Sequence, residues 1–187
     1  ALKCHNYNFT YVHRGISFES ALLDSLMRII SGQAGNVLLG SADELTSNSF
    51  AILQRLGQFK RKPVNNLKLL KDKTRGSIAG EGAAFFLLSN QQSEKSYAHI
   101  MDVETFIYPE NLSETSLHVR DFLIRNQLSA DNIDLLITGI NGDPFTDIPY
   151  REVSGHLFPT TGKAYFKHLC GEYLTSASFA LWLGAMI

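Results

Sequence analysis

The sequence predicts an α/β protein built from alternating strands and helices, and three observations support this. Apolar runs of strand length alternate with segments whose apolar residues recur every three or four positions. The 187 residues are 44% hydrophobic and 19% charged, which is enough apolar material to bury a core. No repeat or low-complexity segment interrupts this alternation. The pattern therefore favours layered α/β architecture.

The first predicted unit is a strand at 8–14, a tight turn at Gly15, and a helix at 17–31. Ser17 is the expected N-cap, because its hydroxyl can accept from free N–H groups of the first turn. Gly32 is expected to end the helix, and a buried strand follows at 36–41. This arrangement either aims a helix N-terminus at a ligand or simply packs the core.

The later elements follow from the same patterns. Ser47 or Asn48 should cap the second helix, and Ser113 or Ser116 should begin the third. The polar stretch 91–96 is the best candidate for an internal boundary. The remaining predictions are a helix at 47–56 closed by Gly57, a basic loop at 58–75, a glycine-rich approach and strand at 76–89, a strand at 98–108, a helix ending at 127, a strand at 133–137, a turn-rich loop at 138–144 and an apolar helix through 181–183.

Composition excludes several function classes. The net charge of −1 and the lack of a basic stripe argue against nucleic acid. The basic segment around Lys60 and Arg75 indicates either a solvated surface or a docking patch for an acidic partner. Cys4 and Cys170 are too few for a disulfide framework or zinc site, which fits a reducing cytoplasm. No membrane-spanning run or signal peptide is present. The missing initial Met indicates a piece of a longer chain or a processed form.

Four motifs resemble one known family. They are Phe18-Glu-Ser-Ala-Leu-Leu-Asp24, Asn36-Val-Leu-Leu-Gly-Ser-Ala-Asp-Glu44, Gly80-Glu-Gly-Ala-Ala84 and Lys167-His-Leu-Cys-Gly-Glu-Tyr-Leu-Thr-Ser-Ala-Ser178. In order and spacing the chain resembles β-ketoacyl-acyl carrier protein synthases of the thiolase superfamily. The resemblance implies a layered α-β-α-β-α fold of two similar halves. Residues 1–95 would then end the first half and 96–187 begin the second, so the fold is incomplete relative to the full family.

The resemblance also implies a catalytic set that this chain does not carry. The family uses a cysteine at a helix start and two histidines. The cysteine position falls at Gly15, and the histidine positions fall at Thr138 and Glu172. Only Lys167 matches the family. Lys167 and Glu172 are expected to form a buried ion pair where the catalytic pair would otherwise lie.

Two side chains are fallback nucleophiles. Ser17 lies at a helix start, but it needs a general base, and only His13 is near in sequence. Cys170 lies between Lys167 and Glu172, although a free cysteine is more often a small buried hydrophobe. The histidines show no spacing typical of a metal site, and no cofactor motif is present. Asp143 and Asp147 either hold a cation or cap a turn, and turn chemistry explains them better.

These observations predict a partner subunit similar to the chain-length factors, with a degenerate active site of its own. The implied partners are acyl carrier protein, an acyl thioester, and a competent ketoacyl synthase in a heterodimer, or a second copy in a homodimer. One alternative is an active 3-oxoacyl-acyl carrier protein synthase or acyltransferase, using Ser17, Cys170 or residues on a missing segment. The other is a non-catalytic scaffold module.

Overall fold

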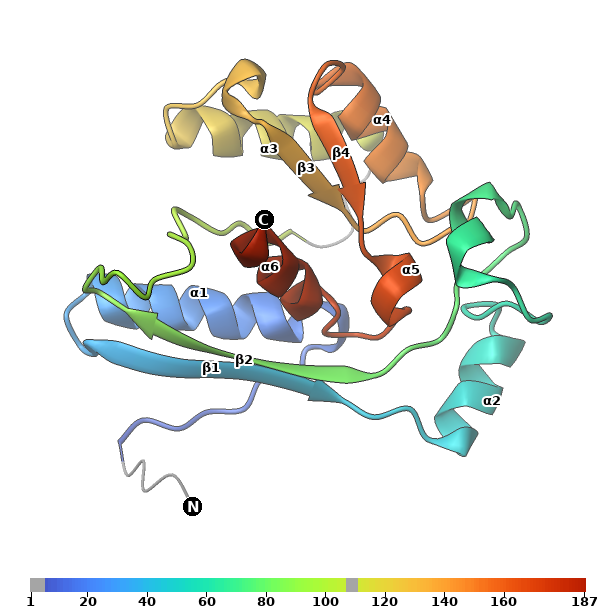
Figure 1. The fold of residues 1–187 in the computed structure, drawn as a ribbon, viewed down its shortest axis with the longest axis horizontal. Helices are drawn as coiled ribbons and strands as arrows, with labels where there is room; N and C mark the ends of the chain where they lie inside the picture. Colours follow the sequence, from blue (N-terminus) through green and yellow to red (C-terminus); the bar gives the residue numbers. More distant parts are fainter. Residues whose placement is uncertain (1–5, 107–110) are drawn as a thin grey trace.

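The computed structural model describes residues 6–106 and 111–187, and its elements stack in layers (Figure 1). Two small sheets lie apart, with helices between them and further helices covering the far face of one sheet (Figure 1). The helices are α1 Ser17–Ile30, α2 Ser47–Arg55, α3 Leu112–Arg125, α4 Ile148–His156, α5 Lys167–Cys170 and α6 Ala177–Met186; the strands are β1 Asn36–Asp43, β2 Gly82–Ser89, β3 Leu135–Thr138 and β4 Gly162–Tyr165; the 3₁₀ turns are η1 Arg14–Ile16, η2 Asn66–Lys71 and η3 Ala130–Asn132.

The first sheet is the antiparallel pair β1–β2, which runs in register from Asn36 opposite Ser89 to Asp43 opposite Gly82. Successive side chains point to opposite faces. The inner face packs on α1 and α6 and forms the core around Phe18, Leu22, Leu39 and Phe86. The outer face is apolar as well, although it is open: Leu38, Phe85 and Leu87 are 49%, 67% and 72% exposed. A strand pair that is apolar on both faces is typical of a sheet covered on both sides.

The second sheet is the parallel pair β3–β4, joined by the crossover helix α4. Helices α3 and α4 contact one another on the outer face of this sheet (Figure 1). On the inner face α6 approaches β3 so closely that a Cβ on Gly184 would lie 3.3 Å from Ile137 Cδ1. Helix α6 also contacts β2 and α1, so it joins the two sheets. The layer order is therefore β1–β2, then α1 and α6, then β3–β4, then α3 and α4.

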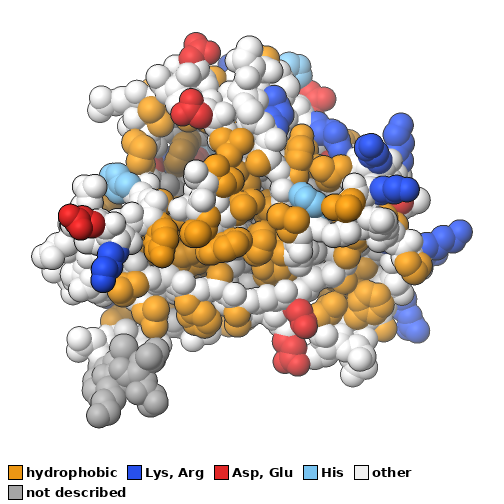
Figure 2. Space-filling model, viewed as in Figure 1, with side chains coloured by type: hydrophobic (Ala, Val, Ile, Leu, Met, Phe, Trp, Pro, Cys, Tyr) orange, Lys and Arg blue, Asp and Glu red, His pale blue; other side chains and the backbone are white. Residues whose placement is uncertain are grey.

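The molecule exposes far more surface than a compact monomer of its size. The accessible area is 12973 Å², whereas a folded monomer of 20.8 kDa exposes about 9,000 Å². Helix α6 is apolar on nearly every side, yet Trp182 and Met186 are 46% and 55% exposed. Figure 2 shows a continuous apolar band across this face. Within the described residues, no helix has the length and apolarity that a membrane span requires.

Two predicted strands are wrong. Residues 8–13 belong to no strand and have no ladder partner, and residue 14 already belongs to η1. Residues 98–106 likewise form no strand, and 107–108 lie outside the described residues. An extended segment becomes a strand only beside a hydrogen-bonding neighbour. The second segment is held by side chains instead, with Arg125 Nη2 2.7 Å from Asp102 Oδ2 and His118 Nδ1 2.9 Å from Glu104 Oε1.

Most helix predictions are confirmed in extent, whereas the expected caps shift. Ile16 occupies the N-cap of α1, so Ser17 is the first helical residue rather than the cap. Thr46, not Ser47 or Asn48, caps α2 by accepting from Ser49 N at 3.2 Å. Asn111 caps α3 by accepting from Glu114 N at 2.9 Å. Helix α4 and strand β4 were not predicted, and the 58–75 loop contains η2, whose Leu69 is fully buried.

Candidate functional site

A cavity of about 1180 Å³ lies between the α2 region and the β3–β4 layer. Its walls are mostly apolar and include Leu53, Phe59, Phe106, Val119, Leu136 and Val153. Its polar lining includes Lys167, Glu172, Asn141 and Thr138. Arg75, an exposed residue, also lines the cavity and therefore marks its open side. This is the shape of a site for an apolar ligand fixed by a few polar groups.

The expected ion pair between Lys167 and Glu172 is present in this cavity. Lys167 Nζ lies 2.5 Å from Glu172 Oε1 and also donates to Ser176 Oγ. The lysine side chain is 8% exposed and the glutamate side chain 28%. Lys167 is thus largely enclosed, while the carboxylate keeps contact with the cavity.

The glycine-rich approach to β2 explains how Glu172 is held. Gly80 N donates to Glu172 O at 3.1 Å, and Glu172 N donates to Ile78 O at 2.8 Å. A Cβ on Gly80 would lie 2.1 Å from Cys170 O, so only glycine permits this approach. Gly171, with φ of 77°, ends α5 in the left-handed region and turns the chain toward Glu172. The Gly80 and Lys167 motifs therefore form one structural unit.

The loop after β3 brings Asn141 to the same carboxylate. Asn141 Nδ2 donates to Glu172 Oε2 at 2.7 Å. Its own backbone is fixed by Asp147, which is 1% exposed and accepts from Asn141 N at 2.8 Å and Gly142 N at 3.2 Å. Gly142 has φ of 84°, which allows both N–H groups to face one carboxylate. Asp147 therefore acts as a turn-capping residue here.

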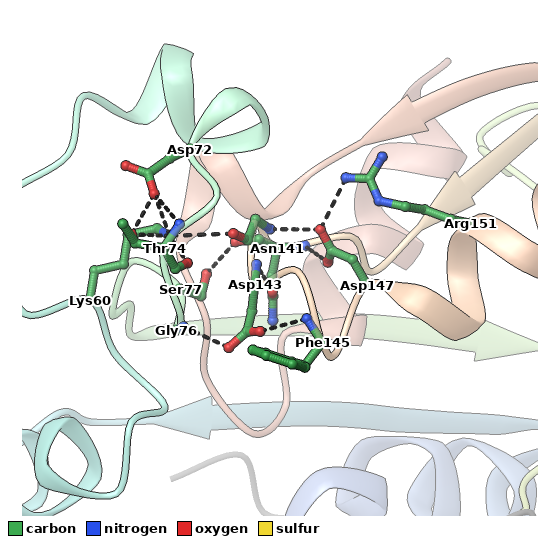
Figure 3. A network of polar contacts seen from close by, with 11 residues as sticks. Lys60, Asp72, Thr74, Gly76, Ser77, Asn141, Asp143, Phe145, Asp147 and Arg151 are labelled. Carbon is green, nitrogen blue, oxygen red and sulfur yellow. Dashed lines mark hydrogen bonds and ion pairs between the residues drawn. The ribbon is translucent and has the colours of Figure 1, made fainter.

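A second group of hydrogen bonds joins the 58–77 segment to the loop after β3 (Figure 3). Lys60 is 7% exposed, and its Nζ donates to Thr74 O at 2.8 Å and to Gly142 O at 3.3 Å. We call the whole set the Lys60 network. Its members are Lys60, Asp72, Thr74, Gly76, Ser77, Asn141, Asp143 and Asp147.

Asp143 is the acidic centre of this network. Its Oδ2 accepts from Gly76 N at 2.6 Å and its Oδ1 from Phe145 N at 2.9 Å. Burial alone would raise the pKa of Asp143, but these N–H groups outweigh it and hold the pKa below its usual value. Both oxygens are used by backbone donors, which supports the turn explanation of Asp143 over a cation site. The described residues contain no group of three or more His, Cys, Asp or Glu suited to a metal ion.

The start of α1 makes fewer and more local hydrogen bonds than the Lys60 network. Ser17 Oγ donates to Arg14 O at 2.8 Å and accepts from His13 N at 2.8 Å. The His13 ring reaches Ser20 Oγ, at 3.4 Å from Nδ1, rather than Ser17. A Cβ on Gly15 would meet no atom within 4 Å. The Ser17 hydroxyl therefore closes the turn before α1, and the His13 ring does not contact it as a general base would.

Glu19, in the first turn of α1, interacts electrostatically with Lys167 of the ion pair. Burial raises the pKa of Glu19, and the charge of Lys167 partly opposes that rise. Burial and the charges of Glu172, Asp147 and Glu19 raise the pKa of Tyr150. Tyr150 lines the cavity together with Glu172.

The other predicted site residues are placed as follows. Thr138 is 5% exposed at the end of β3, and its Oγ1 has no hydrogen-bond partner among the described residues. Burial raises the pKa of Cys170, whose Sγ donates to Gly171 O at 3.3 Å, so its thiol stays protonated. Cys4 lies outside the described residues. Sequence reasoning treated Asn141 only as a turn former, although it is the side chain that reaches Glu172.

Comparison with known proteins shows what this arrangement resembles. No protein-family model and no curated protein matches the sequence. The ishigamide ketosynthase/chain length factor matches with a TM-score of 0.67 and 21% identity, over 90% of this chain and 44% of its own. A β-ketoacyl synthase from Burkholderia phymatum STM815 matches with a TM-score of 0.64 and 18% identity, over 91% and 46%.

A third structure agrees with these two. It is the AntDE:AntF complex, a type II polyketide synthase acyl-carrier protein with its hexaketide-bound ketosynthase. It matches with a TM-score of 0.65 and 16% identity, over 91% of this chain and 48% of its own. The chain has half of a ketosynthase fold. At these identities the likeness is one of fold, and the chain spans less than half the length of each ketosynthase chain.

Proposed function

We propose that this chain is a non-catalytic subunit of the chain-length-factor type that works with a competent ketosynthase. In this role its cavity holds and shapes an acyl chain delivered as a thioester on an acyl carrier protein. Residues 1–95 are assigned to the end of the first ketosynthase half, and 96–187 to the start of the second. The first carries the antiparallel β1–β2 pair, the second the parallel β3–β4 pair.

The observation that carries the proposal is that the described residues contain no activated nucleophile beside the ion pair. Gly15 offers no side chain, and the Ser17 hydroxyl proton is directed at Arg14 O. Cys170 keeps its proton because burial raises its pKa. Transfer of an acyl group to the protein needs a nucleophile with a base or a lowered pKa. The cavity therefore supports acyl binding rather than acyl attachment.

The surface supports an assembly. An excess of roughly 4,000 Å² over a compact monomer is more than the roughly 1,000–2,500 Å² that each partner contributes to an obligate interface. The exposed basic residues of 55–75 are Arg55, Arg61, Lys62, Lys68, Lys71, Lys73 and Arg75. Figure 2 shows basic side chains gathered along one side of the molecule. Because Arg75 lies on the open side of the cavity, this surface favours an acidic protein as the carrier.

Intact-protein mass spectrometry tests the proposal. The chain is incubated with a mass-labelled acyl-carrier-protein thioester, alone and with a candidate ketosynthase. We expect no adduct on this chain, an adduct on the ketosynthase, and a change in product length when this chain is added.

Two other results would each replace the proposal. An adduct mapped to Ser17 or Cys170 in this chain alone would make it an active acyltransferase. Failure to bind either a ketosynthase or an acyl carrier protein would leave the scaffold module.

A further inference from the structure

Glu172 is the polar group most open to the cavity at the ion pair, and its chemistry restricts what can bind there. An ionised carboxylate only accepts hydrogen bonds, and it offers about four lone-pair positions. Lys167 occupies one position on Oε1 and Asn141 one on Oε2. The remaining positions are free to accept, and the side chain is 28% exposed against 8% for Lys167. The pair therefore presents an acceptor rather than a cation to the cavity.

The neighbouring groups reinforce this polarity. Asn141 is fixed in one orientation, because its Oδ1 accepts from Asp143 N at 3.0 Å and its Nδ2 points at Glu172. Lys167 also donates to Ser176, which is 3% exposed, so its ammonium group is engaged by two protein partners. Glu172 and Asp147 both act electrostatically on Tyr150, which lines the same cavity.

The rest of the cavity is apolar. Phe106, Val119, Leu136 and Val153 contribute its walls, and its volume of about 1180 Å³ admits a long hydrocarbon chain. A ligand that fits both features is apolar along its length and carries one neutral hydrogen-bond donor. A hydroxyl group on an acyl chain meets this description. A carboxylate placed beside Glu172 does not, since the adjacent cation, Lys167, is already engaged by Glu172 and Ser176, and Arg75 lies on the open side of the cavity.

We propose that Glu172 selects an acyl ligand that carries a hydroxyl group and excludes an acyl group that ends in a carboxylate. This inference rests on the proposed acyl-binding function. A hydrogen bond to a charged acceptor in a partly dry site favours the hydroxylated ligand by about tenfold or more. The preference for a hydroxylated ligand depends on the hydrogen that the hydroxyl donates, so a methyl ether at the same carbon should bind no tighter than the unsubstituted chain.

Isothermal titration calorimetry of the unmodified chain tests this without a variant. The probes are S-acyl pantetheine thioesters: octanoyl, its 3-, 5- and 7-hydroxy derivatives, the matching methyl ethers, and malonyl. We expect one hydroxy isomer to bind about tenfold tighter than octanoyl, its methyl ether to bind no tighter than octanoyl, and malonyl not to bind. Equal affinities for octanoyl and every hydroxy isomer, or binding of malonyl as tight as octanoyl, would overturn the inference while leaving the proposed function in place. Failure of every thioester to bind would overturn both.

Glu172→Gln assigns the effect to this residue. The amide keeps the shape and one acceptor oxygen but loses the charge, so the hydroxyl preference should shrink to about threefold and weak malonyl binding should appear. Glu152→Gln, on the exposed surface of α4 and outside the cavity lining, should leave the ranking unchanged. A ranking that survives Glu172→Gln would contradict the assignment. The methyl ether comparison holds even if that variant folds poorly.

Discussion

The start of α1 and the ion-pair side of the cavity are built very differently. At the start of α1, residues 13–17 are held by short-range contacts, and Gly15 faces open space. On the other side, local contacts are joined by long-range ones: Asn141 reaches Glu172 across 31 positions, and Lys60 reaches Gly142 across 82. The side that would carry a nucleophile is loose, and the side that would contact a bound acyl group is rigid. This difference favours a binding role over a covalent one.

The largest effect on stability is expected from a substitution in the Lys60 network. Lys60→Met removes a buried cation and leaves Thr74 O and Gly142 O without this donor, while Asp72 keeps only its contacts with Thr74. Removing one partner of a buried charged group costs about 3 kcal/mol of unfolding free energy. Urea denaturation followed by circular dichroism measures the loss.

Lys68→Met is the matched control, because Lys68 is exposed in η2. It should change the free energy of unfolding by less than about 0.5 kcal/mol. Similar losses for the two variants would mean that the Lys60 network does not hold the loop.

A smaller effect concerns the pH dependence of the same network. The pKa of Asp143 is below its usual value in the folded chain, so its carboxylate contributes stability above the unfolded pKa of about 4. That stability is lost as the pH falls through the lower, folded pKa. Asp143→Asn should therefore be less stable than the unmodified chain by about 1 to 2 kcal/mol at pH 7.

Urea titrations at a series of pH values give the decisive comparison for Asp143→Asn. The difference between the two proteins should shrink steadily below pH about 4. A difference that stays constant down to pH about 2 would show that the Asp143 charge contributes nothing. Asp131→Asn, at an exposed aspartate in η3, should show no such trend.

The same contrast explains what the sequence could predict. The helix α1 and the strands β1, β2 and β3 follow from local apolar patterns, which fix their type and approximate bounds. Residues 8–14 and 98–108 also have extended patterns, but strand formation depends on a neighbour that a local pattern does not contain. Helix α4 was missed because its apolar face is weak.

The site follows the same rule. The Lys167–Glu172 pair was predictable, because its members are five positions apart and the motif places both in one short unit. The contact of Asn141 with Glu172 was not, because it depends on the positive φ of Gly142 and on Asp147 facing inward. The Asn-Gly-Asp sequence indicated a turn but gave no sign of what the turn would present.

The smallest effect on stability is expected from a substitution at the start of α1. Ser17→Ala removes the contacts with His13 N and Arg14 O, both of them exposed, so it should cost about 0.5 kcal/mol. It should leave acyl binding and product length unchanged, because the hydroxyl neither caps α1 nor faces a base. Thr46→Ala serves as the control, since Thr46 does cap a helix and its loss should cost about 1 kcal/mol. Thermal unfolding ranks the two variants, and the coupled ketosynthase assay reads product length. If Ser17→Ala abolished the length effect while keeping its fold, the start of α1 would be part of the working site, and the contrast between the two sides would fail.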